Sequence, residues 1–350
     1  MKFFNLDCHV SVIEDIKNIF EAQGHQVTSW SISGHNWIFN RSSTDVKVIN
    51  SNSWMSLNDN KINQFCEEYA NFLKEFDGFI CTYPPAFSLI FERFKKPVIL
   101  QIPIRYEVPF HNKPDQWINF NERLRNGIDS KLIIPVANSQ YDKDYFEFFV
   151  ERDCDLIPNI CGYTNTHWKP ETNKFLYTGR LPISSNLIVG KNELGRYTWD
   201  LVSKFKGIII IPYNCSTMSI FEHYTANIPL FCPSVDFMIE LYKEHKNSVL
   251  SELTWNQTFK LKQGSSIPCN LENDPNMFEN IEIMKRWIQK SDFYNKEWMP
   301  HIVYFDSFQD LSQKLSTTNV EAVSEEMKNF NIVRKDRINN LWKKKLEKIS

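Results

Sequence analysis

The sequence GIIIIPYNCSTMSIFEHYTANIP, at residues 207–229, decides the fold of this chain. Its four consecutive isoleucines, Ile208–Ile211, predict a strand that is buried on both faces, as strands of a parallel sheet are. Pro212 then ends the strand in a turn, and either Ser216 or Thr217 can cap a following helix. The stretch is therefore one strand–loop–helix unit of an α/β protein.

The order of strand, polar loop and helix predicts a site for a phosphate-bearing ligand, because the N–H groups and the dipole at a helix start attract anions. Glu222 lies about a turn and a half into the helix, where its carboxylate can accept hydrogen bonds from ribose hydroxyls. We therefore predict a nucleotide-sugar site, and the alternative is a βα unit that binds nothing. The candidate contacts in the loop and first turn are Tyr213, Asn214, Ser216, Thr217 and Met218.

The spacing of Glu222 and Pro229, seven residues apart, resembles the donor-binding element of glycosyltransferases with the two-domain GT-B architecture, especially those of family 4. Gly179-Arg180-Leu181 also resembles the Gly-Arg-Leu that opens the second domain of many family 4 enzymes. There the arginine meets the donor diphosphate. The resemblance covers mainly residues 174–235, and it implies that Gly179 and Arg180 belong to the donor site.

Two positions depart from the family pattern. The family's other Glu falls on Asn214, and in retaining members that Glu contacts the donor sugar. The lysine that often follows the arginine is absent, since residues 184–186 are Ser-Ser-Asn. We expect metal-independent, inverting transfer to a glycan or another hydroxyl acceptor, with no cofactor. Two alternatives stay open: a non-catalytic protein of the same fold that binds sugar nucleotides or acts as a scaffold, and a sugar-nucleotide 2-epimerase.

Length and composition favour two domains. At 350 residues the chain exceeds the usual size of one domain, and 42 % hydrophobic residues supply material for two cores. We expect an acceptor-side domain at 1–165, a polar linker, and a nucleotide-sugar domain at 174–318. The resemblance implies that the last segment, 319–350, is helical and returns to the first domain. The predicted class is α/β, with two doubly wound Rossmann-like domains that face a cleft.

The first half alternates short apolar runs with amphipathic segments, as repeated βα units do. This alternation predicts one doubly wound domain, and ligands of such domains gather at the carboxyl ends of the strands. The predicted strands are 2–6, 26–31, 78–82, 98–102 and 132–137, with a short extended piece at 157–159. The predicted helices are 11–23, 61–76 and 139–150.

Asp7 and His9 follow the first predicted strand, and sugar transfer with inversion needs a general base of this kind. His9 can be the base with Asp7 orienting it, or Asp7 can act alone. The alternative is that Asp7 caps the first helix and His9 is a packed imidazole. Trp30 and Trp37 flank a polar loop, and indole faces can stack on sugar rings. The candidate acceptor contacts are Ser33, His35, Asn36, Arg105 and Tyr106.

Charge and cysteine content exclude other classes. A net charge of −2 argues against a nucleic-acid partner, which a basic excess would favour. The eight cysteines show no Cys-x-x-Cys spacing, so we expect reduced core thiols and a cytoplasmic protein. Asp153-Cys154-Asp155 spells a short metal-binding pattern, but it follows charged residues rather than a strand, and we interpret it as surface. No metal site is predicted.

The last twenty residues, from Asn331, contain seven Lys or Arg and two acids. Such a basic amphipathic helix can dock on a membrane surface, where a lipid-linked acceptor would lie. The alternative, which we favour, is that the helix packs back on the protein and leaves its lysines in water. The residues expected on its apolar face are Ile332, Ile338, Leu341, Trp342 and Leu346.

Overall fold

The computed structural model describes residues 1–103, 105–183, 185–251, 273–277 and 280–349. Ser184 and Cys269 lie outside these ranges. The chain divides into two compact units, Met1–Asn159 with Ile338–Ser350, and Ile160–Arg337. The first boundary, after Asn159, precedes the polar stretch that the sequence predicts as a linker. The backbone of that stretch is bonded within the second unit, where the N–H of Trp168 donates to the carbonyl of Ala226 (2.8 Å).

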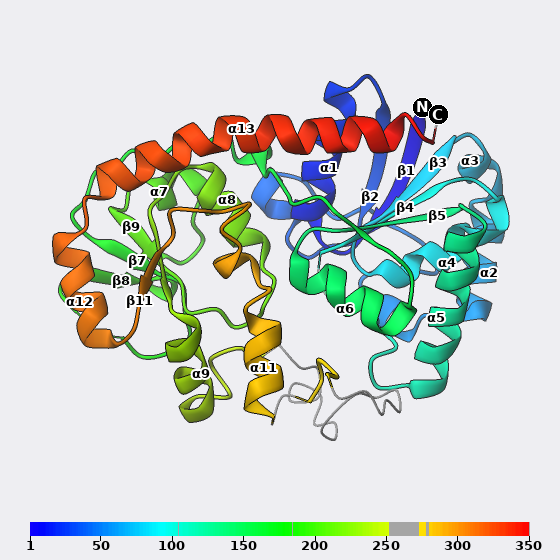
Figure 1. The fold of residues 1–350 in the computed structure, drawn as a ribbon. Coiled ribbons are helices and arrows are strands. Elements are labelled where there is room, and N and C mark those ends of the chain that lie inside the picture. The colour runs from blue at the N-terminus through cyan, green and yellow to red at the C-terminus, as the bar shows by residue number, and fades with distance from the viewer. Residues whose placement is uncertain (104, 184, 252–272, 278–279, 350) are drawn as a thin grey trace. The chain divides into compact units, whose positions relative to one another are not determined.

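Unit 1 contains a six-stranded parallel sheet with the order β2-β1-β3-β4-β5-β6 (Figure 1). The strands lie where short apolar runs predict them, except that the last one precedes the predicted piece at 157–159. Their bounds are β1 Lys2–Asp7, β2 Gln26–Ser31, β3 Gly78–Cys81, β4 Val98–Ile102, β5 Ile133–Ala137 and β6 Asp155–Leu156.

Helices cover both faces of this sheet. Phe3 packs against Phe20 of α1 (centroids 5.5 Å apart), whereas the next residue, Phe4, packs against Phe72 of α3 (5.4 Å) and Phe91 of α4. Because successive strand residues point to opposite faces, α1 covers one face and α3 and α4 cover the other. The helix predicted at 61–76 is divided into α2 and α3, and α5 was not predicted. The helices are α1 Val10–Ala22, α2 Asp59–Glu68, α3 Ala70–Lys74, α4 Ser88–Phe91, α5 Pro114–Asp129 and α6 Gln140–Val150.

Unit 2 contains a five-stranded parallel sheet with the order β11-β10-β9-β7-β8. All of Ile208–Ile211 is buried, as predicted, but β9 itself ends at Ile209. The strands are β7 Phe175–Tyr177, β8 Ile188–Gly190, β9 Gly207–Ile209, β10 Leu230–Pro233 and β11 Val303–Phe305. The helices that belong wholly to this unit are α7 Trp199–Ser203, α8 Met218–Thr225, α9 Val235–Glu244, α11 Ile281–Ile288 and α12 Phe308–Thr317. The predicted class, α/β with two doubly wound parallel sheets, is confirmed.

The two sheets share one topology. In unit 1, β1 has β2 on one side and β3 on the other, and in unit 2, β7 has β8 on one side and β9 on the other. The chain therefore reverses its direction across the sheet at β1/β3 and at β7/β9. Open α/β sheets bind ligands at the carboxyl ends of the strands at such topological switch points. The fold thus marks one candidate position in each unit.

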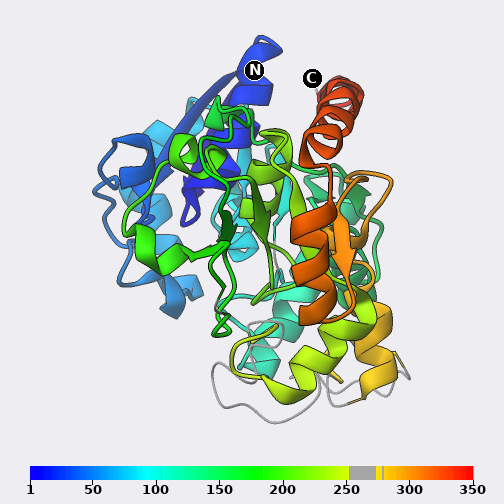
Figure 2. The same ribbon diagram turned by 90° about the vertical axis from the view of Figure 1, so that its left-hand side faces the viewer.

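The chain ends in α13 (Val320–Leu346), a helix of 27 residues. Figure 1 shows it as one unbroken ribbon, and Figure 2 shows it nearly end-on. Its final part belongs to unit 1, where Trp342 packs against Phe20 with centroids 5.2 Å apart. Ile338 is also buried, but Ile332 is 61 % exposed, so its expected place on the apolar face is wrong. The two residues are six positions apart, which places them about 240° apart around a helix.

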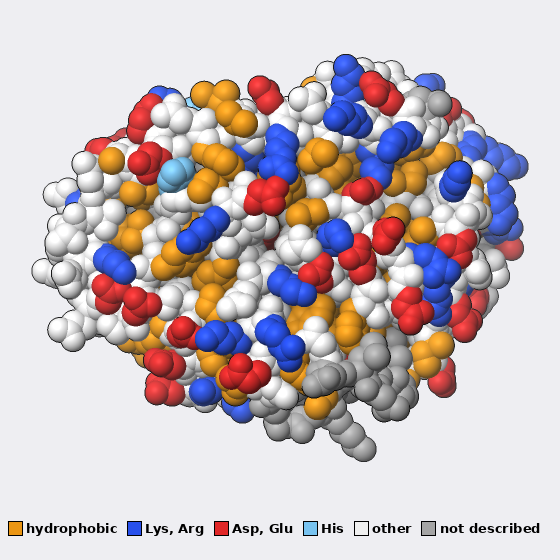
Figure 3. All heavy atoms as spheres, viewed as in Figure 1, with side chains coloured by type: hydrophobic (Ala, Val, Ile, Leu, Met, Phe, Trp, Pro, Cys, Tyr) orange, Lys and Arg blue, Asp and Glu red, His pale blue; other side chains and the backbone are white. Residues whose placement is uncertain are grey.

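The outward side of α13 has mixed charge. Its exposed residues include Glu325, Glu326 and Asp336 as well as Lys343 and Lys344. The face of the molecule drawn in Figure 3 likewise intersperses Lys and Arg with Asp and Glu. Of the helices in the described ranges, none has the length and apolar character needed to cross a bilayer.

Candidate functional site

The switch point of unit 2 brings Arg180 and Tyr213 together. Arg180 follows β7 and Tyr213 follows β9, and the guanidinium carbon lies 4.4 Å from the centroid of the phenol ring. Arg180 Nη1 also donates a hydrogen bond to Ser251 Oγ (2.9 Å). The cation–π contact holds the guanidinium beside the loop that leads into α8. Arg180 is nevertheless exposed, so its charge can reach a ligand.

Gly179 is required by the tight turn after β7. A Cβ atom at this position would lie 2.1 Å from the hydroxyl oxygen of Tyr177. That hydroxyl accepts a hydrogen bond from the N–H of Leu181 (3.0 Å), and burial raises the pKa of Tyr177 to about 12, so the phenol stays neutral. Only glycine leaves room for this bond, which fixes the backbone on either side of Arg180.

Helix α8 begins as the sequence predicts. Thr217 is its N-cap residue, and the Thr217 carbonyl accepts from the N–H of Ile220 (3.3 Å), but the Thr217 hydroxyl makes no capping bond. Ser216 and Met218 are buried on either side. The Thr217 side chain therefore does not cap α8, and N–H groups at the start of a helix attract anions.

Asn214, at the position where the retaining family members have Glu, is also buried. Its amide oxygen accepts a weak hydrogen bond from the Cys215 thiol (3.3 Å). A neutral amide in this place cannot act as a carboxylate would, neither as a nucleophile nor as an ionic contact to a sugar hydroxyl.

Glu222 is half-buried in the middle of α8, and its Oε1 accepts a hydrogen bond from Tyr163 Oη (2.7 Å). Tyr163 lies in a short 3-10 turn, Gly162–Thr164, and its ring packs at 5.5 Å from the ring of Trp199 at the start of α7. Sequence reasoning missed both aromatic residues. Tyr163 precedes Glu222 by 59 positions, and no local pattern links them.

The switch point of unit 1 brings together Asp7, at the end of β1, and Thr82, just after β3. Asp7 is fully buried and accepts hydrogen bonds from the Thr82 hydroxyl, from the His9 N–H (2.5 Å) and, at 3.5 Å, from the Tyr83 N–H. Burial raises the pKa of Asp7 to about 7, although these three donors oppose the shift. The carboxyl therefore titrates near neutral pH.

His9 is linked to Asp7 by its backbone N–H; no bond joins the Asp7 carboxylate to the imidazole. The side chain of His9 is exposed just before α1, and no side-chain capping bond is made there. The pKa of the His9 imidazole is lowered to about 4, mainly because the surrounding protein desolvates the ring and more weakly because of the charge of His35, even though the residue as a whole is exposed. The imidazole is therefore neutral at pH 7, which is the form that accepts a proton.

The loop after β2 holds Ser33, His35 and Asn36. Asn36 is buried, and its side-chain amide donates to the carbonyl of Ser33 (2.8 Å). Ser33 Oγ accepts from the N–H of His35 (3.1 Å). Ser33 and Asn36 thus hold the loop in shape, whereas the His35 side chain is exposed. Trp30 stacks on Phe72 (4.7 Å between centroids) inside the unit.

Arg105 and Tyr106 lie in the interior of unit 1. Arg105 pairs with the buried Glu107 (2.7 Å), and the Tyr106 hydroxyl donates to Asn121 (2.7 Å) and accepts from the indole N–H of Trp117 (2.9 Å). The structure therefore does not bring these two residues to the surface beside Asp7 and His9.

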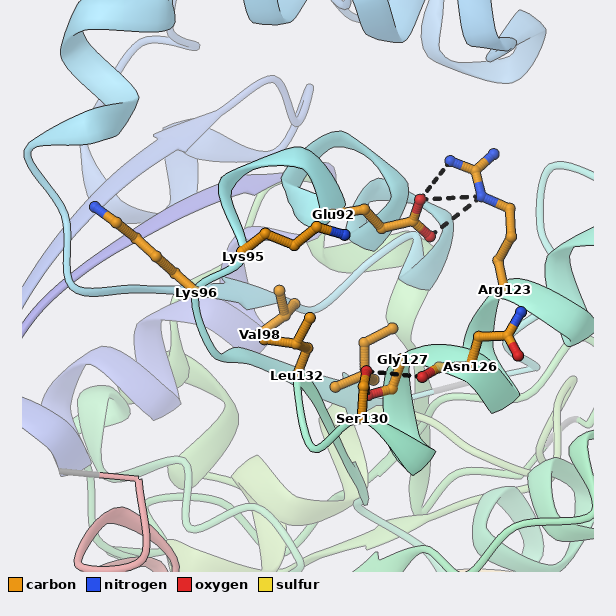
Figure 4. Close-up of a pocket in the computed structure, with 10 residues that line it drawn as sticks. Glu92, Lys95, Lys96, Val98, Arg123, Asn126, Gly127, Ser130 and Leu132 are labelled. Atoms are coloured by element: carbon orange, nitrogen blue, oxygen red, sulfur yellow. Dashed lines mark hydrogen bonds and ion pairs between the residues drawn. The ribbon is translucent and has the colours of Figure 1, made fainter.

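A cavity of about 240 Å³ lies at the opposite ends of the strands of unit 1, near the amino ends of β4 and β5 (Figure 4). Two charged residues that line the cavity, Arg123 and Glu92, form an ion pair with each other (Arg123 Nη2 to Glu92 Oε2, 2.6 Å). The cavity is thus separate from the carboxyl ends that carry the candidate residues. Within the described ranges, no group of three or more His, Cys, Asp or Glu has the arrangement of a metal site.

No protein-family model matches the sequence, and no curated protein matches it. Several solved structures match the fold. They include the glycotransferase of kitacinnamycin (10 % identity over 98 % of both chains, TM-score 0.45) and CalG4, the calicheamicin glycosyltransferase (9 % identity, 100 % of this chain and 98 % of that chain, TM-score 0.43). Another is SpnG, a spinosyn rhamnosyltransferase complexed with thymidine diphosphate (8 % identity, 95 % and 96 %, TM-score 0.42). These structures are glycosyltransferases, but at such identities and TM-scores the likeness assigns the chain to no family.

Proposed function

We propose that this protein transfers a sugar from a nucleotide-sugar donor to a hydroxyl group of an acceptor. The observation that carries the proposal is the contact of Arg180 with Tyr213, 4.4 Å from guanidinium to ring, at the switch point of unit 2. Arg180 is an exposed cation, and this contact holds it beside the loop that leads to the N-terminus of α8. A diphosphate at this position would meet both the guanidinium and the first N–H groups of the helix.

Glu222 extends the donor site toward the nucleoside. A carboxylate on the same helix can accept hydrogen bonds from ribose hydroxyls, and Tyr163 fixes one of its oxygens (2.7 Å). The phenol therefore orients the carboxylate, which lowers the entropy that a ligand must remove on binding. The neighbouring indole of Trp199 adds an apolar surface beside this pair.

His9 is the group that we assign as the general base, and Asp7 is a positioning residue. Asp7 has no exposed surface, and it holds the His9 backbone N–H at 2.5 Å. In the reaction, the acceptor hydroxyl gives its proton to a ring nitrogen of His9 and its oxygen bonds to the anomeric carbon of the donor. The bond from that carbon to the diphosphate breaks, and the electron pair leaves with the diphosphate.

The stereochemistry and the metal requirement belong to the same proposal. An amide at Asn214 in place of a carboxylate supports transfer with inversion, because it leaves His9 as the group that activates the acceptor. Arg180 and the start of α8 provide positive charge for the leaving diphosphate, which supports metal-independent transfer. Activity that disappears with EDTA and returns with Mn²⁺ would contradict the second point.

Product analysis tests the proposal. The protein is incubated with UDP-, GDP-, ADP-, CMP- and TDP-sugars, with and without a mixture of glycoside acceptors, and the products are separated by mass spectrometry. We expect a new glycoside together with free nucleotide, only when acceptor is present, and loss of both with His9→Ala. Isomerised nucleotide sugar without acceptor would instead identify a 2-epimerase. Donor binding with no turnover would identify a non-catalytic binding protein.

A further inference from the structure

The switch point of unit 1 also carries two aromatic rings that the proposed reaction leaves without a role. Tyr83 follows β3, and its carbonyl accepts a hydrogen bond from the N–H of Cys8 (2.8 Å), next to Asp7. The ring of Tyr83 packs against His9 (centroids 6.3 Å apart) and against Trp54 (5.9 Å). Tyr83 and Trp54 are both half-buried, so each keeps surface that a ligand can cover.

The angles between these rings point to the shape of that ligand. The planes of Tyr83 and Trp54 are inclined by 66°, and those of Tyr83 and His9 by 81°. Rings set edge to face form a corner; they do not form the parallel slot that holds a planar aromatic ligand best. A corner with one apolar face and polar edges suits a pyranose, which has an apolar face of C–H groups and a rim of hydroxyls.

The charged side chains nearby already have hydrogen-bond partners within the protein. Lys61 lies beside the turn that carries Trp54, but its ammonium donates to the carbonyl of Ser53 (3.2 Å) and to the Ser56 hydroxyl. The carboxyl of Asp7 is buried behind the loop. The rings of Tyr83 and Trp54 and the neutral imidazole of His9 can contact the C–H groups and hydroxyls of a sugar.

The loop that carries Trp54 is held in place before any ligand arrives. Ser53 Oγ accepts from the N–H of Asn50 (2.9 Å) and donates to the carbonyl of Val48 (2.7 Å). The N–H of Trp54 donates to the carbonyl of Asn50 (3.1 Å). Val48 has φ = 69°, a conformation that costs a β-branched residue on the order of 1–3 kcal/mol. These bonds hold the backbone that carries Trp54, and they persist although Val48 is strained.

We propose that Trp54 and Tyr83 form the acceptor platform of this protein, and that they bind a pyranose ring of a glycan with one hydroxyl directed at His9. The role of His9 in this statement rests on the proposed sugar transfer. The binding of a pyranose to the two rings does not depend on it, so the two can be tested apart.

Saturation-transfer NMR on the full chain tests the platform without knowledge of the natural acceptor. The probes are methyl glucopyranoside, methyl galactopyranoside and methyl mannopyranoside, with umbelliferone as a planar aromatic probe. We expect at least one pyranoside to receive saturation from the wild type. Its signal should fall about fivefold or more with Trp54→Ala, because the stacking face is lost, and should persist with Trp54→Phe, which keeps a ring. Phe308→Ala removes an exposed ring from α12 of unit 2 and should change nothing.

Two results would overturn the platform: pyranoside signals that are equal in wild type and Trp54→Ala, or binding of umbelliferone with no binding of any pyranoside. Circular dichroism on each variant checks folding, and Trp54→Phe keeps the test decisive if the alanine variant does not fold. Thermal shifts with nucleotide sugars are measured on the same samples. If those shifts persist while pyranoside binding is independent of Trp54, the platform fails and the proposed transfer stands. If the wild type shows no nucleotide shift, the proposed transfer fails whatever the NMR shows.

Discussion

Arg180 lies over the ring of Tyr213, with 4.4 Å between the guanidinium carbon and the ring centroid, and this contact joins the loops after β7 and β9. Asp7 and Thr82 make the corresponding contact in unit 1, between the loops after β1 and β3. In both units the contact lies at the point where the strand order reverses. The topology thus explains where these polar side chains lie, because the loops after two neighbouring strands diverge at a switch point and leave room for a ligand.

Arg180→Ala should weaken the binding of a nucleoside diphosphate about 10- to 100-fold, which corresponds to roughly 1.4–2.8 kcal/mol. Arg180→Lys keeps the charge but loses the planar group that stacks on Tyr213, so its affinity for the nucleoside diphosphate should lie between those of the wild type and Arg180→Ala. Isothermal titration with UDP, GDP, ADP and TDP measures the effect. Arg286→Ala, at an exposed arginine of α11, is the matched control. Equal affinities for wild type and Arg180→Ala would remove Arg180 from the donor site.

Tyr163→Phe removes the hydroxyl that donates to Glu222 (2.7 Å) and leaves the ring beside Trp199. We expect nucleotide affinity to fall about fivefold, since a hydrogen bond to a charged group contributes about 1.5–3 kcal/mol and water replaces much of it when the hydroxyl is removed. The same titration measures this change. An unchanged affinity, with an unchanged melting temperature, would show that Tyr163 does not orient the carboxylate.

Gly179→Ala should destabilise the protein by about 1–3 kcal/mol, because the added methyl group overlaps the Tyr177 hydroxyl and must displace it. Gly34→Ala is the control, since a Cβ there meets no atom within 4 Å. Urea unfolding measures both. If the two variants lose equal stability, the close approach at Gly179 is not what requires glycine.

Asp7→Asn should change how stability depends on pH. The folded-state pKa of Asp7, about 7, lies above its ordinary value of 3.8, so the folded protein binds this proton more tightly than the unfolded chain does. The stability from this proton is fully present below pH 3.8 and is lost as the pH rises through 7. At about 1.36 kcal/mol for each pKa unit, the loss is on the order of 4 kcal/mol.

Asparagine does not titrate, so the difference in unfolding free energy between Asp7→Asn and the wild type should shift in favour of the variant as the pH rises. Urea unfolding at pH 4.5 and at pH 8 measures that difference. Parallel pH profiles for the two proteins would mean that Asp7 is ionised in the folded state at low pH, and that burial does not control its titration.

The strands were predictable because burial on both faces leaves a local signal. Gln26–Ser31 and Val98–Ile102 are found at their predicted bounds. Helix α5 was missed although the sequence carries its signals, since Pro114 opens it and Trp117 and Leu124 recur at helical spacing on its buried face. The helix predicted at 61–76 is interrupted at Tyr69, whose hydroxyl accepts a bond from the backbone of Lys47. That contact between distant segments leaves no local pattern.

The site divides in the same way. Arg180 and Glu222 could be proposed as site residues from the sequence, because Arg180 follows a predicted strand in a Gly-Arg-Leu motif and Glu222 lies in the helix after another predicted strand. Their partners could not, because tertiary structure alone brings them near. Thr82 lies 75 positions from Asp7, and Tyr163 lies 59 positions from Glu222. Trp54 lies in a loop whose course no periodicity describes, so its place beside Tyr83 is visible only in the structure.

The most direct test of the donor site is a thermal-shift panel of UDP-, GDP-, ADP-, CMP- and TDP-sugars on wild type, Glu222→Ala and Glu240→Ala. Glu240 is an exposed glutamate of α9 and serves as the control. A ligand at a hundredfold excess over its dissociation constant stabilises the folded state by about 2.7 kcal/mol. We predict that one nucleotide class stabilises the wild type and Glu240→Ala but not Glu222→Ala. A panel in which no nucleotide sugar shifts the wild type, or in which Glu222→Ala responds as the wild type does, would contradict the donor site in unit 2.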